Sequence, residues 1–219
     1  ILNMNSLYRI DAFDNSNLFG SFSVSGMVVY KNGKPARKEY RKYKIKIDKN
    51  DDYNTMKEVI YRRYYRALME KLEMPQLILV DGGKGQISAA MEVLESLNLN
   101  IKVCGLAKDD KHSTSQLIDG DTLDAYNIDK TSTLFLYLTS IQNEVHRFTI
   151  NYHKQIRSKG LISSILDDIK GLGPKRKNEL IKAFRSINNI KNADLVELEK
   201  YLPSESALEL KRKLEKNDY

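Results

Sequence analysis

The chain has 219 residues, and 36 basic against 29 acidic side chains give it a formal net charge of +7. A hydrophobic content of 41% is enough to bury a core, which excludes a disordered chain. The single cysteine excludes an internal disulfide and favours a reducing, cytoplasmic compartment, and no apolar run reaches the roughly 18 residues of a membrane span. The positive charge is typical of a nucleic-acid binder without establishing one. Because the sequence begins with Ile, we interpret it as a piece of a longer polypeptide.

Three β-rich runs open the chain. They cover Arg9–Asp14, Phe22–Tyr30 and Arg37–Ile47, and polar turns at Asn15-Ser16-Asn17 and Lys31-Asn32-Gly33 separate them. Runs of this kind joined by tight Asn and Gly turns predict an antiparallel meander.

The pattern then alternates between helix and strand, which predicts an α/β fold with a mixed sheet and flanking helices. The expected elements are a helix over 51–68, a strand at Leu77–Val80, a helix that follows Asp81-Gly82-Gly83 and includes Ile87 to Leu94, a strand at Ile101–Leu106 and a long helix over 132–158.

The last 59 residues differ because they carry helical patterns and no strand signal. Ser158-Lys159-Gly160 is the expected linker. The sequence therefore predicts two domains, an α/β domain over 1–158 and a small all-α domain over 161–219.

A Gly-x-Gly turn stands between two helical patterns of the small domain, at Gly171-Leu172-Gly173. Its glycines let backbone N–H groups approach a phosphate, and the basic run after it neutralises the charge. This predicts a helix-hairpin-helix that binds DNA without reading its sequence; the alternative is a plain helical hairpin. A second hairpin near Leu195–Leu214 lacks the glycines, so we expect it to pack rather than bind. The candidate contacts are Gly171, Gly173, Lys175, Arg176 and Lys177.

Two aspartates stand where two predicted strands end. Asp14 closes the first strand and Asp81 the fourth, and we expect these strands to lie parallel and adjacent. Neighbouring strands are roughly 4.8 Å apart, so both carboxylates would meet at one sheet edge. Carboxylates suit Mg²⁺ or Mn²⁺ as ligands. The alternative is that both aspartates merely end strands and start turns.

Three further titratable residues, Asp52, His146 and Asp11, each have a structural alternative to a role in the site. Asp52 opens the first helix, where it could simply cap the helix. His146 lies beside the apolar stripe of the long helix, where a lone histidine is often structural. Asp11 precedes Asp14 by three residues, so strand alternation sends it to the opposite face and outside the site.

Lys84 follows Asp81-Gly82-Gly83 and is placed to meet a phosphate, of DNA or of a nucleotide, although a plain strand-to-helix turn explains the glycines equally well. Lys34–Lys46 is rich in basic residues and could follow a phosphate backbone or form a solvated edge strand. Lys108 and Arg147 complete the candidate DNA contacts.

Several motifs, in order, resemble the UvrC family of bacterial nucleotide excision repair. The motifs are Ile10-Asp11-Ala12-Phe13-Asp14-Asn15-Ser16-Asn17, Lys38-Glu39-Tyr40-Arg41-Lys42-Tyr43, Asp51-Asp52-Tyr53, Asp81-Gly82-Gly83-Lys84-Gly85-Gln86, Gly105-Leu106-Ala107-Lys108-Asp109-Asp110-Lys111-His112 and Glu144-Val145-His146-Arg147-Phe148.

The resemblance implies a ribonuclease-H-like endonuclease domain, followed by tandem helix-hairpin-helix motifs, that cuts damaged double-stranded DNA on the 5′ side of a lesion with Mg²⁺ or Mn²⁺. It implies that Asp14, Asp81 and His146 form a metal-binding triad and that Asp52 is a further acidic residue needed for the cut. UvrB, with UvrA upstream, is the implied partner, although the UvrB-binding segment and the nuclease for the 3′ cut are not in this sequence. Two rivals remain: a non-catalytic DNA-binding scaffold, and another ribonuclease-H-like enzyme such as a junction resolvase or a nuclease for RNA–DNA hybrids.

Overall fold

The computed structural model describes residues 7–16, 23–45, 51–108, 114–167, 169 and 172–216. The chain divides into two compact units, Ile1–Tyr152 and His153–Tyr219. None of the helices within the described ranges is both long enough and apolar enough to cross a membrane.

The first unit is built on a mixed sheet that has eight strands within the described residues. Its order is β3-β2-β1-β5-β6-β7-β8, and β4 also pairs with β2. The central strands β1, β5 and β6 are parallel, whereas β2 and β7 run antiparallel to their neighbours. The strands are β1 (Arg9–Ser16), β2 (Val24–Lys31), β3 (Lys34–Pro35), β4 (Arg41–Lys44), β5 (Leu77–Val80), β6 (Lys102–Lys108), β7 (Thr114–Asp119) and β8 (Ala125–Asn127).

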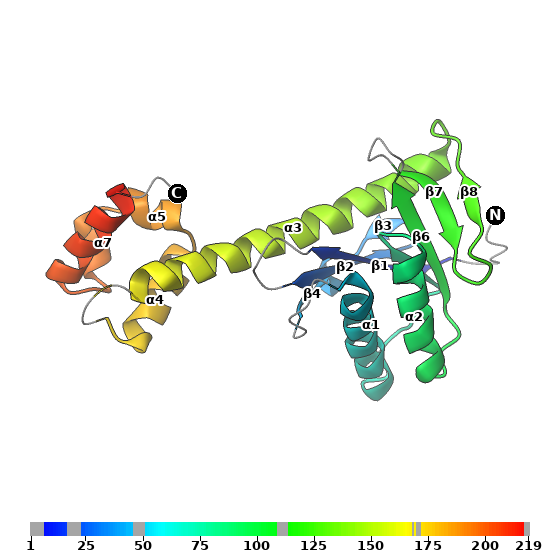
Figure 1. Cartoon of the computed structure of the whole chain (residues 1–219), viewed down its shortest axis with the longest axis horizontal. Helices are drawn as coiled ribbons and strands as arrows, with labels where there is room; N and C mark the ends of the chain where they lie inside the picture. The colour runs from blue at the N-terminus through cyan, green and yellow to red at the C-terminus, as the bar shows by residue number, and fades with distance from the viewer. Residues whose placement is uncertain are drawn as a thin grey trace. The chain divides into compact units, whose positions relative to one another are not determined.

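Helices cover both faces of the sheet, so alternate side chains of each strand enter two different cores (Figure 1). Helices α1 (Asp52–Met69) and α2 (Lys84–Ser96) lie side by side on one face, over Phe13 and its neighbours. The part of α3 (Thr133–Asp167) that belongs to the first unit covers the other face, over Ala12 and its neighbours.

The predicted strand boundaries differ from those of the structure, and β1 continues two residues past Asp14, to Ser16, where a turn was expected. The predicted strand Arg37–Ile47 contains a 3₁₀ turn, η1 (Arg37–Glu39), before β4, and its last two residues lie outside the described ranges. The sequence predicts no strand over Thr114–Asp119, yet these residues form β7. Only the second half of β7 is apolar, so its strand character comes from pairing with β6.

The described part of the second unit is entirely helical around a core of its own, which includes Leu166, Leu180, Leu198 and Leu210. It contains the end of α3, then α4 (Pro174–Phe184), α5 (Ile187–Asn192), α6 (Leu195–Glu199) and α7 (Ser204–Lys216).

The expected linker Ser158-Lys159-Gly160 is wrong as a break in secondary structure, because α3 continues through it to Asp167. One glycine inside a helix costs only about 1 kcal/mol relative to alanine, which the buried turn at Ile165 and Leu166 can offset. The division between the compact units falls earlier, at Tyr152 and His153. The domain ranges 1–158 and 161–219 stay a prediction.

Candidate metal centre

The register of the central strands places Asp14 and Asp81 next to each other. Phe13 of β1 and Val80 of β5 are parallel partners, and the backbone N–H of Asp81 donates to the carbonyl oxygen of Phe13 at 2.8 Å. Asp14 follows Ala12 on the α3 face of β1. Both carboxylates therefore leave the same edge of the sheet, at the carboxyl ends of parallel strands.

Helix α3 adds an imidazole to this pair. The Nδ1 atom of His146 lies 3.2 Å from Oδ2 of Asp14 and 3.8 Å from Oδ2 of Asp81. Gly26 is the β2 partner of Asp14, and a side chain there would overlap Thr149 of α3. The missing side chain lets α3 approach the sheet closely enough for His146 to reach the carboxylates.

The surroundings of Asp14 and Asp81 disfavour the ionised form of both carboxylates at the same time. Asp14 is only 4% exposed, whereas the side chain of His146 is 48% exposed. Burial raises the pKa of Asp14, the hydrogen bond from His146 opposes that rise, and the negative charge of Asp81 adds to it. A cation placed between the carboxylates would remove this penalty.

Asp14, Asp81 and His146 form the one group of potential metal ligands found within the described residues, with one ligand atom from each lying within 4.8 Å of the others. Two carboxylates and an imidazole leave coordination positions for water or substrate, and hard divalent cations accept such a set. These residues fit a divalent metal ion.

Asp52 lies outside this group. It is the exposed first residue of α1, and its neighbour Asp51 caps the helix by accepting from the backbone N–H of Asn54. The backbone carbonyl oxygen of Asp52 accepts from the side chain of Asn15, the residue after Asp14, at 3.4 Å. Asp11 faces α1, on the opposite side of β1, where its carboxylate lies against Arg9 and Tyr64.

The candidate DNA contacts of the first unit are spread around the cluster. Lys84 begins α2, directly after the glycines that follow Asp81, and is exposed. Arg147 is also exposed, and two of its nitrogens donate to the Glu144 carboxylate at 2.9 Å. Lys108 ends β6, and its side chain lies outside the described part of the structure.

In the second unit, Gly173 is the N-cap residue of α4, and the exposed Lys175 and Arg176 lie in its first turn. Lys177 forms an ion pair with Asp167 at 2.6 Å, so a phosphate would have to compete for its ammonium group. Gly171 lies outside the described residues.

Gln142 is a further residue of this site that was not predicted from the sequence. Its amide nitrogen donates to Oδ1 of Asp81 at 2.6 Å and to the carbonyl oxygen of Leu106 at 3.1 Å. A signal was present in the sequence, because Gln142 precedes His146 by four residues and so shares its helix face.

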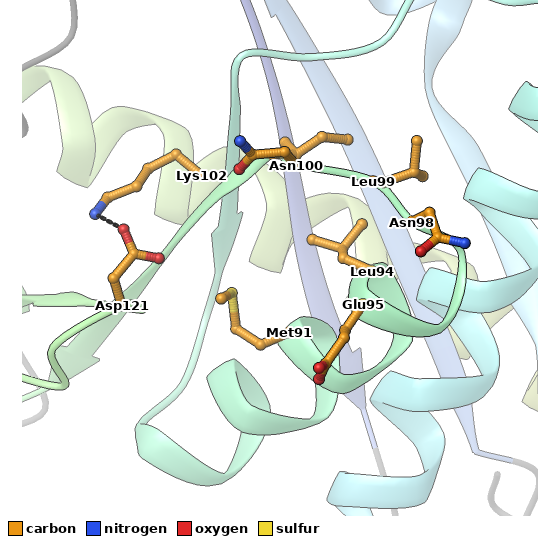
Figure 2. A pocket seen from close by; sticks show the side chains of 9 residues that line it. Met91, Leu94, Glu95, Asn98, Leu99, Asn100, Lys102 and Asp121 are labelled. Carbon is orange, nitrogen blue, oxygen red and sulfur yellow. Dashed lines mark hydrogen bonds and ion pairs between the residues drawn. The ribbon is translucent and has the colours of Figure 1, made fainter.

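A hollow of about 490 Å³ lies at the other end of α2 and β6, away from Lys84 and the cluster. Figure 2 shows its lining side chains, among them Met91, Leu94 and the ion pair of Lys102 with Asp121. The residues of the candidate metal centre do not line this hollow.

The mixed sheet with helices on both faces, the aspartates near the carboxyl ends of two adjacent parallel strands and the family match over residues 1–150 together identify a nuclease domain of the ribonuclease H type. Residues 1–150 match the family described as the UvrC RNAse H endonuclease domain, and the chain belongs to this family. The chain is also 50% identical over 200 residues to the UvrABC system protein C of Streptococcus uberis. That alignment covers 90% of this chain and 34% of the relative, so the chain spans about a third of the relative's length.

Among solved structures, the chain is similar to Ciona intestinalis endonuclease V in complex with DNA, with a TM-score of 0.42, 13% identity and coverage of 70% of this chain and 89% of that one. Human ENDOV gives a TM-score of 0.40 and 11% identity, with coverage of 69% and 86%. The family assignment rests on the sequence matches rather than on these structures.

Proposed function

We propose that this chain is a metal-dependent DNA endonuclease that makes the incision on the 5′ side of a lesion in nucleotide excision repair, with Mg²⁺ or Mn²⁺ as its metal. The observation that carries the proposal is the meeting of Asp14, Asp81 and His146, whose ligand atoms lie within 4.8 Å. In a non-catalytic scaffold, two buried carboxylates beside a histidine would cost stability through their mutual repulsion and bring no benefit.

Asp14 and Asp81 are the residues that would hold the metal, with His146 as the third ligand or as a proton carrier. When bound, a divalent cation neutralises the scissile phosphate and lowers the pKa of an attacking water. If Nδ1 of His146 donates its hydrogen to Asp14, Nε2 is left to accept a proton from that water or to return one to the leaving oxygen.

The phosphate groups of the DNA need their own contacts. Lys84 lies at the N-terminus of α2, where backbone N–H groups and the helix dipole favour an anion, and it follows Asp81 by three residues. We assign to Lys84 the phosphate next to the scissile bond, with Lys108 and Arg147 as further contacts. Asp52, the exposed first residue of α1, is proposed as a further acidic residue needed for the cut, outside the group of metal ligands.

For the second unit, we propose a tandem helix-hairpin-helix that holds the duplex through its backbone. Its support is the exposed pair Lys175 and Arg176 in the first turn of α4, after Gly173. Gly171 and Lys177 complete the assigned contacts. The relative's place in the UvrABC system suggests UvrB, with UvrA upstream, as the partner that delivers damaged DNA.

The test is an incision assay with Asp14→Asn on a lesion duplex that already carries a nick on its 3′ side, with UvrB and Mn²⁺ present. Removing one of two carboxylate ligands should lower the incision rate at least about 1,000-fold, equivalent to about 4 kcal/mol, while duplex binding stays within about twofold. Asp124→Asn is the matched control, because Asp124 is an exposed aspartate in the turn between β7 and β8. Cutting by Asp14→Asn at the normal rate, or a product cut elsewhere than 5′ of the lesion, would overturn the assignment.

A further inference from the structure

Gln142 is a buried polar side chain on an apolar face of α3. Its neighbours Leu138, Ile141 and Val145 belong to the core between α3 and the sheet, and Gln142 itself is 2% exposed. Burying an amide costs free energy unless hydrogen bonds replace those it made with water. The hydrogen-bond partners of the Gln142 amide therefore indicate the role of this buried side chain.

The amide nitrogen of Gln142 carries two hydrogens, and it has two acceptors within reach. One is Oδ1 of Asp81 at 2.6 Å, and the other is the carbonyl oxygen of Leu106 in β6 at 3.1 Å. A serine or threonine hydroxyl has only one hydrogen and could not serve both acceptors. Gln142 thus ties the Asp81 carboxylate to the neighbouring strand.

This contact makes the two oxygens of Asp81 different. Oδ1 is held by Gln142, whereas Oδ2 lies 3.8 Å from Nδ1 of His146. Gln142 precedes His146 by one helical turn, so a single face of α3 both holds the carboxylate and supplies the imidazole.

We propose that Gln142 is a positioning residue that fixes the rotation of the Asp81 carboxylate, so that Oδ2 is presented to Asp14 and His146. This inference rests on the metal centre of the proposed function. A carboxylate held in one rotation loses less conformational freedom when it binds a cation. Removing such a hydrogen-bond partner of a ligand typically costs 10–100-fold in metal affinity or activity.

The test is Gln142→Met, which keeps an unbranched side chain of similar length and removes both donors. We expect the Mn²⁺ dissociation constant, measured by electron paramagnetic resonance on the DNA-free protein, to rise about 10-fold or more. The incision kcat should fall with it while the KM for DNA changes by less than about twofold. Gln116→Met is the matched control, because the Gln116 amide donates to Asn127 at 3.1 Å between β7 and β8. Its Mn²⁺ affinity should equal that of the wild type.

A purely structural role for Gln142 predicts a different result, in which Gln142→Met lowers the melting temperature but leaves Mn²⁺ affinity and kcat unchanged; that result would overturn the inference. If Gln142→Met does not fold, Gln142→Asn replaces it, since its amide is one methylene too short to reach Asp81. The same rise in the Mn²⁺ dissociation constant is expected, and an unchanged constant overturns the inference.

A wild-type protein with no measurable Mn²⁺ binding would overturn the proposed function as well, whereas tight wild-type binding that is unchanged in the variants would overturn the role of Gln142 alone.

Discussion

Strand β1 carries two buried aspartates, three residues apart, on opposite faces of the sheet. Asp11 faces α1, where Arg9 lies 2.8 Å from its carboxylate, Arg63 lies 3.5 Å away and the Tyr64 hydroxyl donates at 3.3 Å. Asp14 faces α3, where its nearest charged neighbours are another carboxylate, Asp81, and the half-exposed His146. Burial raises the pKa of both aspartates. The positive charges of Arg9 and Arg63 oppose that rise at Asp11, whereas at Asp14 the hydrogen bond with His146 opposes it and the negative charge of Asp81 adds to it.

The difference separates a carboxylate held between two guanidinium groups from one that lies beside a second carboxylate. A buried carboxylate between two guanidinium groups is compensated, and its removal strands those groups. A buried carboxylate beside a second carboxylate is a standing cost, which a bound cation would turn into a gain. Composition and burial alone do not distinguish the two aspartates; the groups that face them do.

The largest expected effect is on stability. Asp11→Asn should lower the free energy of unfolding by about 3 kcal/mol or more, because it leaves Arg9 and Arg63 without their buried counter-charge. Asp14→Asn should stay within about 1 kcal/mol of the wild type. Because the pKa of Asp14 is raised, its protonated form favours the folded state; this advantage is fully present below the unfolded-state pKa of about 3.9 and is lost as the pH rises through the folded-state pKa. At pH 7 the ionised carboxylate is therefore destabilising, and the neutral side chain of Asp14→Asn relieves its repulsion with Asp81.

Urea unfolding at pH 7 in the presence of a chelator measures both variants under the same conditions. A larger loss of unfolding free energy for Asp14→Asn than for Asp11→Asn would contradict these assignments, since it would make Asp14 the structural residue of the two.

A smaller effect is expected from metal binding. Mn²⁺ at 100 times its dissociation constant should raise the free energy of unfolding of the wild type by about 2.7 kcal/mol. Asp14→Asn should lose this increment, and Asp124→Asn should keep it. Thermal melts with and without Mn²⁺ provide the measurement, and full stabilisation of Asp14→Asn would place the cation elsewhere.

The smallest expected effect is the pH dependence of the ion pair between Glu73 and Lys31, which lies next to Arg9. Glu73 accepts from Lys31 at 2.7 Å, and this hydrogen bond lowers the pKa of Glu73. A lowered pKa means that the stabilisation is present above the unfolded-state value of about 4.3 and is lost as the pH falls through the folded-state value. Because Glu73 is exposed, Glu73→Gln should cost a few tenths of a kcal/mol at pH 6 and less at pH 3.5. A cost that grows on acidification would contradict this sign.

Strand order and alternation were enough to predict from the sequence that Asp14 and Asp81 meet and that Asp11 faces away. Both conclusions follow from local patterns, since Asp14 and Asp81 end apolar runs and three residues reverse the face of a strand. The helical period of α3 likewise indicated its buried stripe. The match over residues 1–150 confirms the family that the motifs suggested for this part of the chain.

Other features depend on contacts that no local pattern carries. Thr114 and Ser115 are polar and form a strand because β6 offers a partner. Gly160 was expected to break the chain into domains, yet α3 continues through it. Gln142 has a meaning only once α3 is packed on the sheet and Asp81 lies within 2.6 Å of its amide.

The central proposal is that Asp14 and Asp81 hold a divalent metal ion beside His146, and anomalous diffraction from a crystal of this chain soaked in Mn²⁺ tests it most directly. We expect a manganese peak about 2.1 Å from a carboxylate oxygen of both Asp14 and Asp81, on the side of His146. A crystal whose manganese peaks all lie away from these two carboxylates, at a soak concentration well above the dissociation constant measured in solution, would contradict the account.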